Sequence, residues 1–267
     1  MFVFHPQQPV NGVSPENCFY VADSTGQVLA EGLLFPNQYP LLFPDRPLNF
    51  FLSIRSHGVG DDMLLGALLA RAQLIRDLNP GVRCRVFAQV DPQDMAQLAL
   101  YMENGFDNTD ALDVVQVGMP AARPNAPMGY DMGPVPFSSP AEKMAFLSRM
   151  NQYRMDAWTP EMLDKYMSYP HFFALYISRG TELVGEIAFT GDGQMAKLLG
   201  LYIHPNFQHL GLAQILIAAG LKILGEKGVN HVEADVIRRS EKQRKLAAAC
   251  NCSFLRTACF YPGINLD

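Results

Sequence analysis

The sequence has few cysteines, little net charge and no long uninterrupted apolar run. Its five cysteines are an odd number and lack the paired C-x-x-C spacing of zinc sites, so we expect reduced thiols and no metal site. The longest apolar run, Leu210 to Leu224, contains Gln214 and Lys222 and is shorter than the roughly 20 residues of a membrane span. The first ten residues lack the basic and apolar regions of a signal peptide. These absences favour a cytoplasmic protein with no membrane partner.

The charge balance also argues against nucleic acid as a partner. The net charge is −5 and the isoelectric point is about 5.7, so the chain has no general basic field to hold a phosphate backbone. One dense basic cluster, Arg238 to Lys245, is typical of the solvated face of a helix. Hydrophobic residues make up 49% of the 267 residues, enough to bury a core in one large domain or two small ones.

Apolar periodicity predicts a mixed α/β chain whose two halves share one order of elements. In the first half we expect strands at 18–23, 28–35, 48–54, 83–90 and 112–117, and helices at 61–78 and 92–104. In the second half we expect two helices first, at 140–155 and 159–167. Strands follow at 172–178, 182–189, 197–203, 231–237 and 254–261. One further helix ends near residue 226 and another covers 240–250. The stretch from Gly118 to Pro140 is rich in proline and predicts an extended or irregular connection. These patterns divide the chain into residues 1–120, a connection at 121–139, and residues 140–267.

Matching landmarks in the two halves indicate a duplication. Gly58 and Gly211 each follow a strand and open a helix, and they lie 153 residues apart. Phe106 and Phe254 each follow a small residue, and they lie 148 residues apart. A nearly constant offset is the signature of an internal repeat. The alternative is that two unrelated α/β units share a common order.

The loop before the long helix of the second half has the features of an anion site. Its pattern is Gln208-x-x-Gly211-x-Ala213, in which small residues let the backbone approach a ligand at a helix N-terminus. The free N–H groups and the positive end of the helix dipole suit a pyrophosphate. Neither half contains G-x-x-x-x-G-K-[ST] or G-x-G-x-x-G, so nucleoside triphosphate and dinucleotide sites are disfavoured.

This pattern resembles the [QR]-x-x-G-x-[GA] loop of the GNAT superfamily of N-acetyltransferases, in which the loop binds the pyrophosphate of acetyl-CoA. Arg55-x-x-Gly58-x-Gly60 fits the same pattern, and the Leu100 to Phe106 segment is similar to a later LYxxxGF segment of the family. The resemblance implies a tandem acyl-CoA N-acyltransferase (GNAT) fold with a mixed sheet, whose first repeat is truncated and lacks the initial strand and helix pair. It implies acetyl-CoA as co-substrate, held by Leu201, Ile203, Gln208, His209, Leu210, Gly211, Leu212, Ala213 and Gln214.

Charge at the two loops favours the second half as the acetyl-CoA site. Asp61 and Asp62 follow the first loop and would repel a pyrophosphate, whereas the corresponding Gln214 and Ile215 are neutral. The first repeat is therefore expected to be degenerate. The basic cluster at 238–245 could contact the 3′-phosphate of CoA in place of solvent.

The resemblance also directs attention to acid–base residues. Many relatives carry a glutamate on the strand that here reads 196–201, and Glu186 on the preceding strand is the best replacement as general base; the alternative is an edge or solvent-facing side chain. Tyr101 matches the tyrosine that protonates the leaving thiolate in many relatives, so it would serve if the first repeat were active. For the second repeat Tyr202 is a candidate donor, although a half-buried strand aromatic explains it equally well.

We therefore expect an N-acetyltransferase acting on an amine of a small molecule or peptide. The alternative is a non-catalytic CoA-binding or protein-interaction module that kept the fold, because neither repeat carries every expected catalytic residue. A nucleic-acid-associated factor is a third, weaker reading. The sequence does not indicate the acceptor or the oligomeric state.

Overall fold

The structure, a computed structural model, describes residues 1–36, 42–56, 58–153 and 157–267. Three short segments lie outside the described residues: residues 37–41, between the strands predicted at 28–35 and 48–54; residue 57 of the first glycine loop; and the end of the helix predicted at 140–155. The chain forms two compact units, Met1–Leu112 with Thr257–Asp267, and Asp113–Arg256. We call these the first and the second unit.

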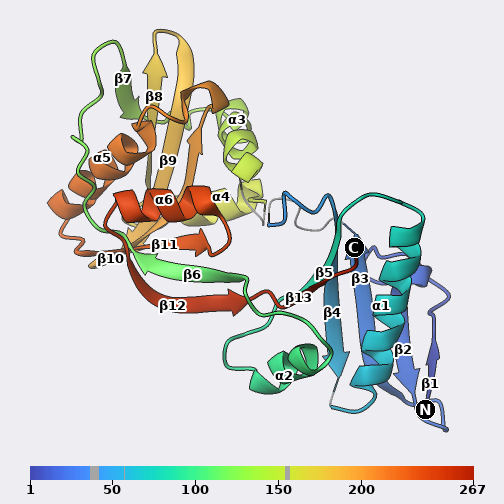
Figure 1. The fold of residues 1–267 in the computed structure, drawn as a ribbon. Helices are drawn as coiled ribbons and strands as arrows, with labels where there is room; N and C mark the ends of the chain where they lie inside the picture. Colours follow the sequence, from blue (N-terminus) through green and yellow to red (C-terminus); the bar gives the residue numbers. More distant parts are fainter. Residues whose placement is uncertain (37–41, 57, 154–156) are drawn as a thin grey trace. The chain divides into compact units, whose positions relative to one another are not determined.

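The first unit contains a six-stranded sheet in the order β1-β2-β3-β4-β5-β13 (Figure 1). Its strands are β1 (Phe2–Phe4), β2 (Cys18–Ala22), β3 (Val28–Pro36), β4 (Leu48–Ser56), β5 (Cys84–Ala88) and β13 (Gly263–Asn265). The other elements are the short 3₁₀ helix η1 (Pro15–Asn17) and the helices α1 (Asp61–Asp77) and α2 (Met95–Glu103). Only β4 and β5 run parallel; the other neighbouring pairs are antiparallel.

The second unit contains a seven-stranded sheet in the order β12-β6-β11-β10-β9-β8-β7. Its strands are β6 (Ala111–Gln116), β7 (Asp131–Pro134), β8 (Phe173–Arg179), β9 (Glu182–Asp192), β10 (Met195–Ile203), β11 (His231–Ile237) and β12 (Ser253–Phe260). Its helices are α3 (Pro140–Met150), η2 (Asn151–Tyr153), α4 (Pro160–Met167), η3 (Pro205–Phe207), α5 (Leu212–Glu226) and α6 (Glu241–Ala249). The predicted mixed α/β class and the order of the long elements are confirmed.

Three short strands, β1, β7 and β13, were not predicted from the sequence. Strand β1 corrects the expectation that the first repeat lacks its initial strand. The first repeat lacks the helix pair, as predicted, since the described residues between β1 and β2 hold only η1. It does not lack the initial strand, because β1 pairs antiparallel with β2. Strand β1 has three residues, too few for an alternation to stand out, and its strand conformation is stabilised by pairing with β2.

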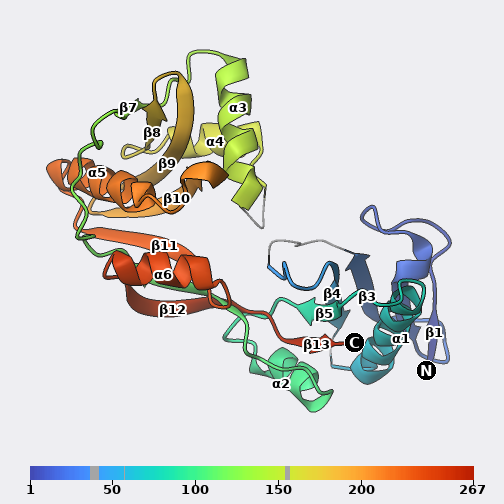
Figure 2. The same cartoon turned by 45° about the horizontal axis from the view of Figure 1, so that its top comes forward.

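The second sheet is covered on both faces, as Figure 2 shows for α3 and α5. Helix α5 packs one face through a core that includes Leu212, Leu216 and Phe189. Helices α3 and α4 cover the other face through Phe146 and Leu163, together with Trp158 from the segment that precedes α4. Helix α3 begins with a capping box, in which Ser139 and Glu142 satisfy each other's backbone N–H groups.

An aromatic row takes the place of the helix pair in the first unit. Helix α1 covers one face of the sheet through Leu64, Leu65 and Leu68. On neighbouring strands Phe35, Phe51 and Phe87 lie opposite one another, and Phe43 packs edge-on against Phe87. These tilted and edge-on aromatic side chains bury large apolar areas on this face of the sheet.

The C-terminal strand is tied into the first unit by a buried arginine. Arg85 on β5 is 4% exposed and forms hydrogen bonds of 3.0–3.1 Å with both carboxylate oxygens of Asp107, with Asp110 and with Asn265 of β13. Strand β13 pairs with β5, and Asp267 accepts hydrogen bonds from Arg46 and from the backbone N–H of Cys84. The first unit is therefore built from both ends of the chain.

No helix among the described residues is long and apolar enough to cross a membrane. The five cysteines are all unpaired, as expected.

We expect the substitution Arg85→Met to destabilise the first unit by about 3–5 kcal/mol, because it leaves the buried Asp110 carboxylate without its cation. The rates of amide hydrogen exchange in β5 and β13 measure this loss of stability at the two strands. Arg83→Leu, at an exposed position just before the same strand, is the matched control and should change the free energy of unfolding by less than about 0.5 kcal/mol. Equal protection of β5 in both variants would contradict the role given to Arg85.

Candidate functional site

The glycine loop of the second unit joins the end of β10 to the start of α5. Gly211 is the N-cap of α5 and has φ +72°, a left-handed conformation that side chains disfavour. Before it, η3 (Pro205–Phe207) is anchored by the buried Phe207, and the following His209 and Leu210 are exposed. The loop is thus a fixed turn that presents its backbone to solvent.

The first turn of α5 offers backbone donors and carries no negative charge. No side chain caps the helix and no acidic residue lies in its first turn. The N–H groups of Gln214 and Ile215 donate to the carbonyl of Gly211, at 3.1 and 3.3 Å. Those of Leu212 and Ala213 precede any intrahelical acceptor, as helix geometry requires. This end of α5 is suited to an anion.

Beside this helix, the parallel ladder between β10 and β11 ends early. The two strands pair from Met195 with His231 to Leu198 with Ala234, yet β10 continues to Ile203 and β11 to Ile237. The register of β10 with β9 shifts between Leu198 and Gly200, which marks a bulge at the same point. A bulge bends the strand locally, so it accounts for the end of the ladder.

After the bulge, alternate N–H groups of β10 point away from β9. His204 donates to the carbonyl of Val184 at 2.8 Å, and Tyr202 lies opposite Glu186 in the same register. In an antiparallel pair every second residue bonds across, so the N–H groups of Leu201 and Ile203 face the side of β11, where the ladder has ended. The two strand positions predicted for the cofactor are those whose backbone donors face this side.

Gln208 links three elements of this region. Its Nε2 donates to the carbonyl of Ile203 at 3.2 Å, and its Oε1 accepts from Lys242 in the first turn of α6. The sequence placed Gln208 among cofactor contacts and did not foresee the partnership with Lys242. Other members of the basic cluster are also engaged: Arg238 forms a bidentate pair with Asp113 at 2.6 and 2.9 Å, and Lys245 pairs with Glu241.

Glu186 is buried in the middle of the sheet and paired. Its carboxylate is bound by Arg149 of α3, at 2.7 Å from Nε and 2.8 Å from Nη2, and the residue is 2% exposed. Burial raises the pKa of Glu186, although the Arg149 guanidinium opposes the shift. The edge or solvent-facing alternative for this residue is wrong, because β9 is an interior strand.

The tyrosine candidates are placed differently. Tyr202 lies opposite Glu186, 5% exposed, in the core formed with α3 and α4. Tyr101 belongs to the first unit, is 1% exposed beside Phe106, and has a pKa raised mainly by burial. The structure therefore brings Tyr202 and Glu186 together and leaves Tyr101 in a separate core.

The first unit repeats the loop geometry without its chemistry. Gly60 is the N-cap of α1 with φ +85°, and β4 pairs with β5 only from Leu48 to Leu52 although it continues to Ser56. The described register between β3 and β4 shows no shift. Asp61 and Asp62 occupy the first turn of α1.

Comparisons with known proteins agree with this arrangement. Residues 143–251 match the model of the acetyltransferase (GNAT) family. This segment lies within the second unit, which therefore carries a GNAT acetyltransferase domain. A GCN5-related N-acetyltransferase from Sphaerobacter thermophilus is similar in structure over 96% of this chain and 82% of its own, with 14% identity and a TM-score of 0.53. A conserved protein of unknown function from Enterococcus faecalis V583, described as a probable N-acyltransferase, matches over 92% of this chain and 61% of its own, with 11% identity and a TM-score of 0.54.

A search of curated proteins found no match. The match to the GNAT family over residues 143–251 indicates acyl transfer as the general chemistry, and this segment includes β8–β11, the glycine loop and α5 described above.

We expect Gly211→Ala to lower the free energy of unfolding of the second unit by about 1–2 kcal/mol, because alanine is strained at φ +72°. Gly225→Ala is the matched control in the last turn of the same helix, where an added Cβ meets nothing within 4 Å, and it should stabilise by up to about 0.5–1 kcal/mol. Urea unfolding followed by fluorescence of Trp158, the only tryptophan, reports on this unit. Two shifts of the same sign would contradict the strain at Gly211.

The raised pKa of Glu186 predicts how stability depends on pH. The folded state binds this proton more tightly than the unfolded state, so the stabilisation is full below about pH 4.3 and is lost as pH rises through the raised pKa. Glu186→Gln removes the titration, and its free energy of unfolding should therefore fall less than that of the wild type as pH rises from about 4.5. Urea midpoints across this range test the slope; parallel curves would show that Glu186 does not titrate differently on folding.

Proposed function

We propose that the second unit is an N-acetyltransferase, which transfers the acetyl group of acetyl-CoA to an amine of a small molecule or peptide. One observation carries the proposal. The parallel ladder between β10 and β11 ends at a bulge, beside a helix whose first turn is uncharged and capped by a left-handed glycine. Free backbone N–H groups are then available both at the end of β10 and at the start of α5, which follow each other along the chain.

The residues present suit the two ends of such a co-substrate. The N–H groups of Gly211, Leu212 and Ala213 at the start of α5 are suited to hold a pyrophosphate, with no carboxylate in the first turn to oppose it. The N–H groups of Leu201 and Ile203 are suited to hold the amide-bearing arm and the acetyl carbonyl. Lys242 and Gln208 fix the loop between these two groups of donors.

When bound, acetyl-CoA supplies a thioester carbon open to attack by an amine. A backbone N–H of β10 aimed at the carbonyl oxygen stabilises the negative charge that develops there. The new C–N bond forms as the C–S bond breaks, the nitrogen loses a proton to a base, and the thiolate gains one from an acid. An alkylammonium with a pKa near 10.4 must first be deprotonated, so a base is needed at neutral pH.

Glu186 and Tyr202 are the residues we propose for these proton transfers. They lie opposite each other on β9 and β10, on the face covered by α3 and α4. Because both carboxylate oxygens of Glu186 are bound by Arg149, we propose that Glu186 accepts the proton through water and that Arg149 holds the carboxylate in place. Tyr202 is the proposed donor to the thiolate.

We further propose that the two units are repeats of one fold, of which the first has lost the cofactor. Both contain a strand, a left-handed glycine and a helix in the same order. The glycine that caps the helix is Gly211 in the second unit and Gly60 in the first, not Gly58 as the motif spacing indicated. The acidic first turn of α1 and the unshifted register of β4 distinguish the first unit.

Acetyl-CoA binding tests the assignment to the second unit. A concentration a hundredfold above the dissociation constant should stabilise the wild-type second unit by about 2.7 kcal/mol. Gly211→Glu should abolish this gain, because it places a carboxylate at the start of α5. Gly58→Glu is the matched control, since it has the same left-handed strain and charge in the first unit, and it should keep the gain. Trp158 fluorescence during urea unfolding, with and without acetyl-CoA, measures the effect.

Loss of the gain only in Gly58→Glu would move the site to the first unit, and no gain in the wild type would exclude acetyl-CoA. Release of free CoA thiol with a panel of amines then separates enzyme from non-catalytic module. Binding without release across the panel would favour the module. Propionyl-CoA and succinyl-CoA, run in parallel, show whether acetyl is preferred.

A further inference from the structure

The first turn of α6 lies where the ladder between β10 and β11 has ended. The two strands pair only as far as Leu198 and Ala234, and α6 follows β11 after a short turn. Helix α6 packs beside β11 (Figure 1), and none of its residues is fully buried. Because so little of α6 enters the core, its polar contacts contribute much to where its first turn lies.

One of these contacts holds the end of β11. The N–H of Ile237 donates to Oε1 of Gln243 at 2.7 Å. Earlier in the strand, the N–H of His231 bonds to the carbonyl of Gln194, which immediately precedes β10. Every second residue of a strand directs its N–H to the same side, so the N–H of Ile237 also faces β10. Gln243 therefore takes the place that a carbonyl of β10 would have in a continued ladder.

A second contact from the same helical turn holds the end of β10. The carbonyl of Ile203 accepts from Nε2 of Gln208 at 3.2 Å, and Oε1 of Gln208 accepts from Lys242. Lys242 and Gln243 are neighbours, so adjacent residues of α6 bind the two strands, one through Gln208 and the other directly. Ser240 caps this turn by accepting from the N–H of Gln243 at 3.3 Å, which fixes the backbone that carries both contacts.

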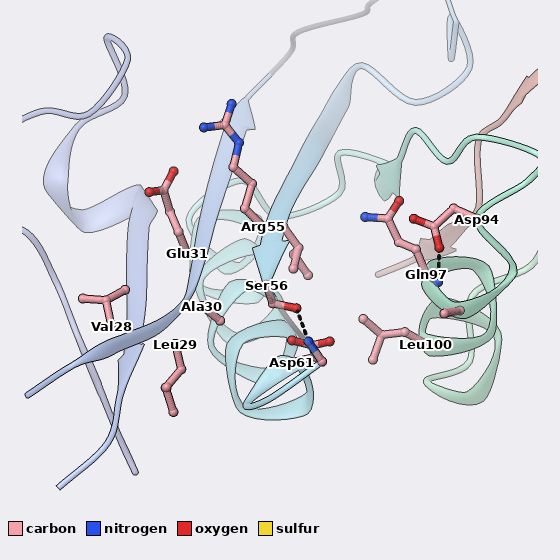
Figure 3. A pocket seen from close by; sticks show the side chains of 13 residues that line it. Val28, Leu29, Ala30, Glu31, Arg55, Ser56, Asp61, Asp94, Gln97 and Leu100 are labelled. Atoms are coloured by element: carbon pink, nitrogen blue, oxygen red, sulfur yellow. Dashed lines mark hydrogen bonds between the residues drawn. The ribbon is translucent and has the colours of Figure 1, made fainter. Parts of the chain in front are cut away.

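The first unit has a similar opening with a different arrangement at the helix. The ladder of β4 and β5 ends at Leu52 and Ala88, and the end of β4 and the start of α2 line a cavity of about 670 Å³ (Figure 3). There Asp94 accepts from the N–H of Gln97 at 2.9 Å, a bond within the first turn of α2 itself. The described residues at this end of α2 do not repeat the two contacts of α6. These contacts therefore distinguish the unit whose helix N-terminus is uncharged.

We propose that Gln243 is a positioning residue of the co-substrate site, which holds the end of β11 so that the opening beside β10 keeps its shape for the acyl-carrying arm. This inference rests on the proposed function. Because both strands are held by one helical turn, their backbone donors need not rearrange when the co-substrate arrives, and such preorganisation favours binding. No proton transfer is assigned to Gln243.

Amide hydrogen exchange and acetyl-CoA binding, both measured on the full chain, test this role. Gln243→Met keeps the length of the side chain but removes the acceptor, so the Ile237 N–H should exchange about five- to tenfold faster, the effect of losing one hydrogen bond. The N–H groups between His231 and Ala234 should keep their wild-type rates. The dissociation constant of acetyl-CoA should rise about three- to tenfold. Gln243→Glu keeps an oxygen acceptor and should restore slow exchange at Ile237.

Ala248→Met is the matched control, because it places the same uncharged side chain at an exposed position of the same helix. It should change neither the exchange of Ile237 nor the binding of acetyl-CoA. Adenosine diphosphate carries a pyrophosphate without the acyl arm, so as a competitor of acetyl-CoA it should have the same inhibition constant in Gln243→Met and in the wild type. A loss confined to acetyl-CoA separates positioning of the strands from a general disturbance of the site.

Two results would overturn the role of Gln243 alone: wild-type exchange at Ile237 in Gln243→Met, or faster exchange with unchanged acetyl-CoA binding. An equal loss of affinity for adenosine diphosphate and acetyl-CoA would also overturn it. If the wild type binds no acetyl-CoA, the proposed function fails and the positioning role fails with it. The wild-type titration therefore shows which of the two proposals is wrong.

Discussion

The fold of the second unit depends on one irregularity, the bulge that ends the parallel ladder of β10 and β11. A continuous ladder would use every N–H group of β10 and leave nothing for a ligand. By shifting the register between Leu198 and Gly200, the strand keeps its bonds to β9 while its opposite edge is freed. The helix that follows begins at the left-handed Gly211, where the missing Cβ leaves the backbone open to close approach.

The sequence predicted the long elements and the loop well, because those signals are local. The apolar face of 61–77 and the glycine at 211 each depend on a few neighbouring residues. The sequence could not predict the bulge, since it is a relation between β10 and its neighbours. Nor could it place Arg149 beside Glu186 or Lys242 beside Gln208, because each pair joins elements more than thirty residues apart in sequence. The sequence showed an acid in an apolar strand but not the arginine that binds it.

Short strands were missed for a related reason. Strands β1 and β13 have three residues each and are held by the partner strand more than by their own pattern. For β13 the buried Arg85 adds a further tie through Asn265, so the end of the chain completes a sheet that began near residue 2. Leaving the buried Arg85 guanidinium with only some of its partners would cost free energy of folding, so these bonds favour the observed position of β13 beside β5.

The two helix N-termini show how one backbone geometry can serve opposite charges. Gly60 and Gly211 have nearly the same φ, +85° and +72°, and each begins a long helix whose first N–H groups are unpaired within the helix. Two side chains decide the difference. With Leu212 and Ala213 the positive end of α5 stays open to an anion, whereas Asp61 and Asp62 neutralise that of α1. The same backbone geometry therefore presents different charge at the two helix N-termini, because the side chains of the first helical turn set its sign.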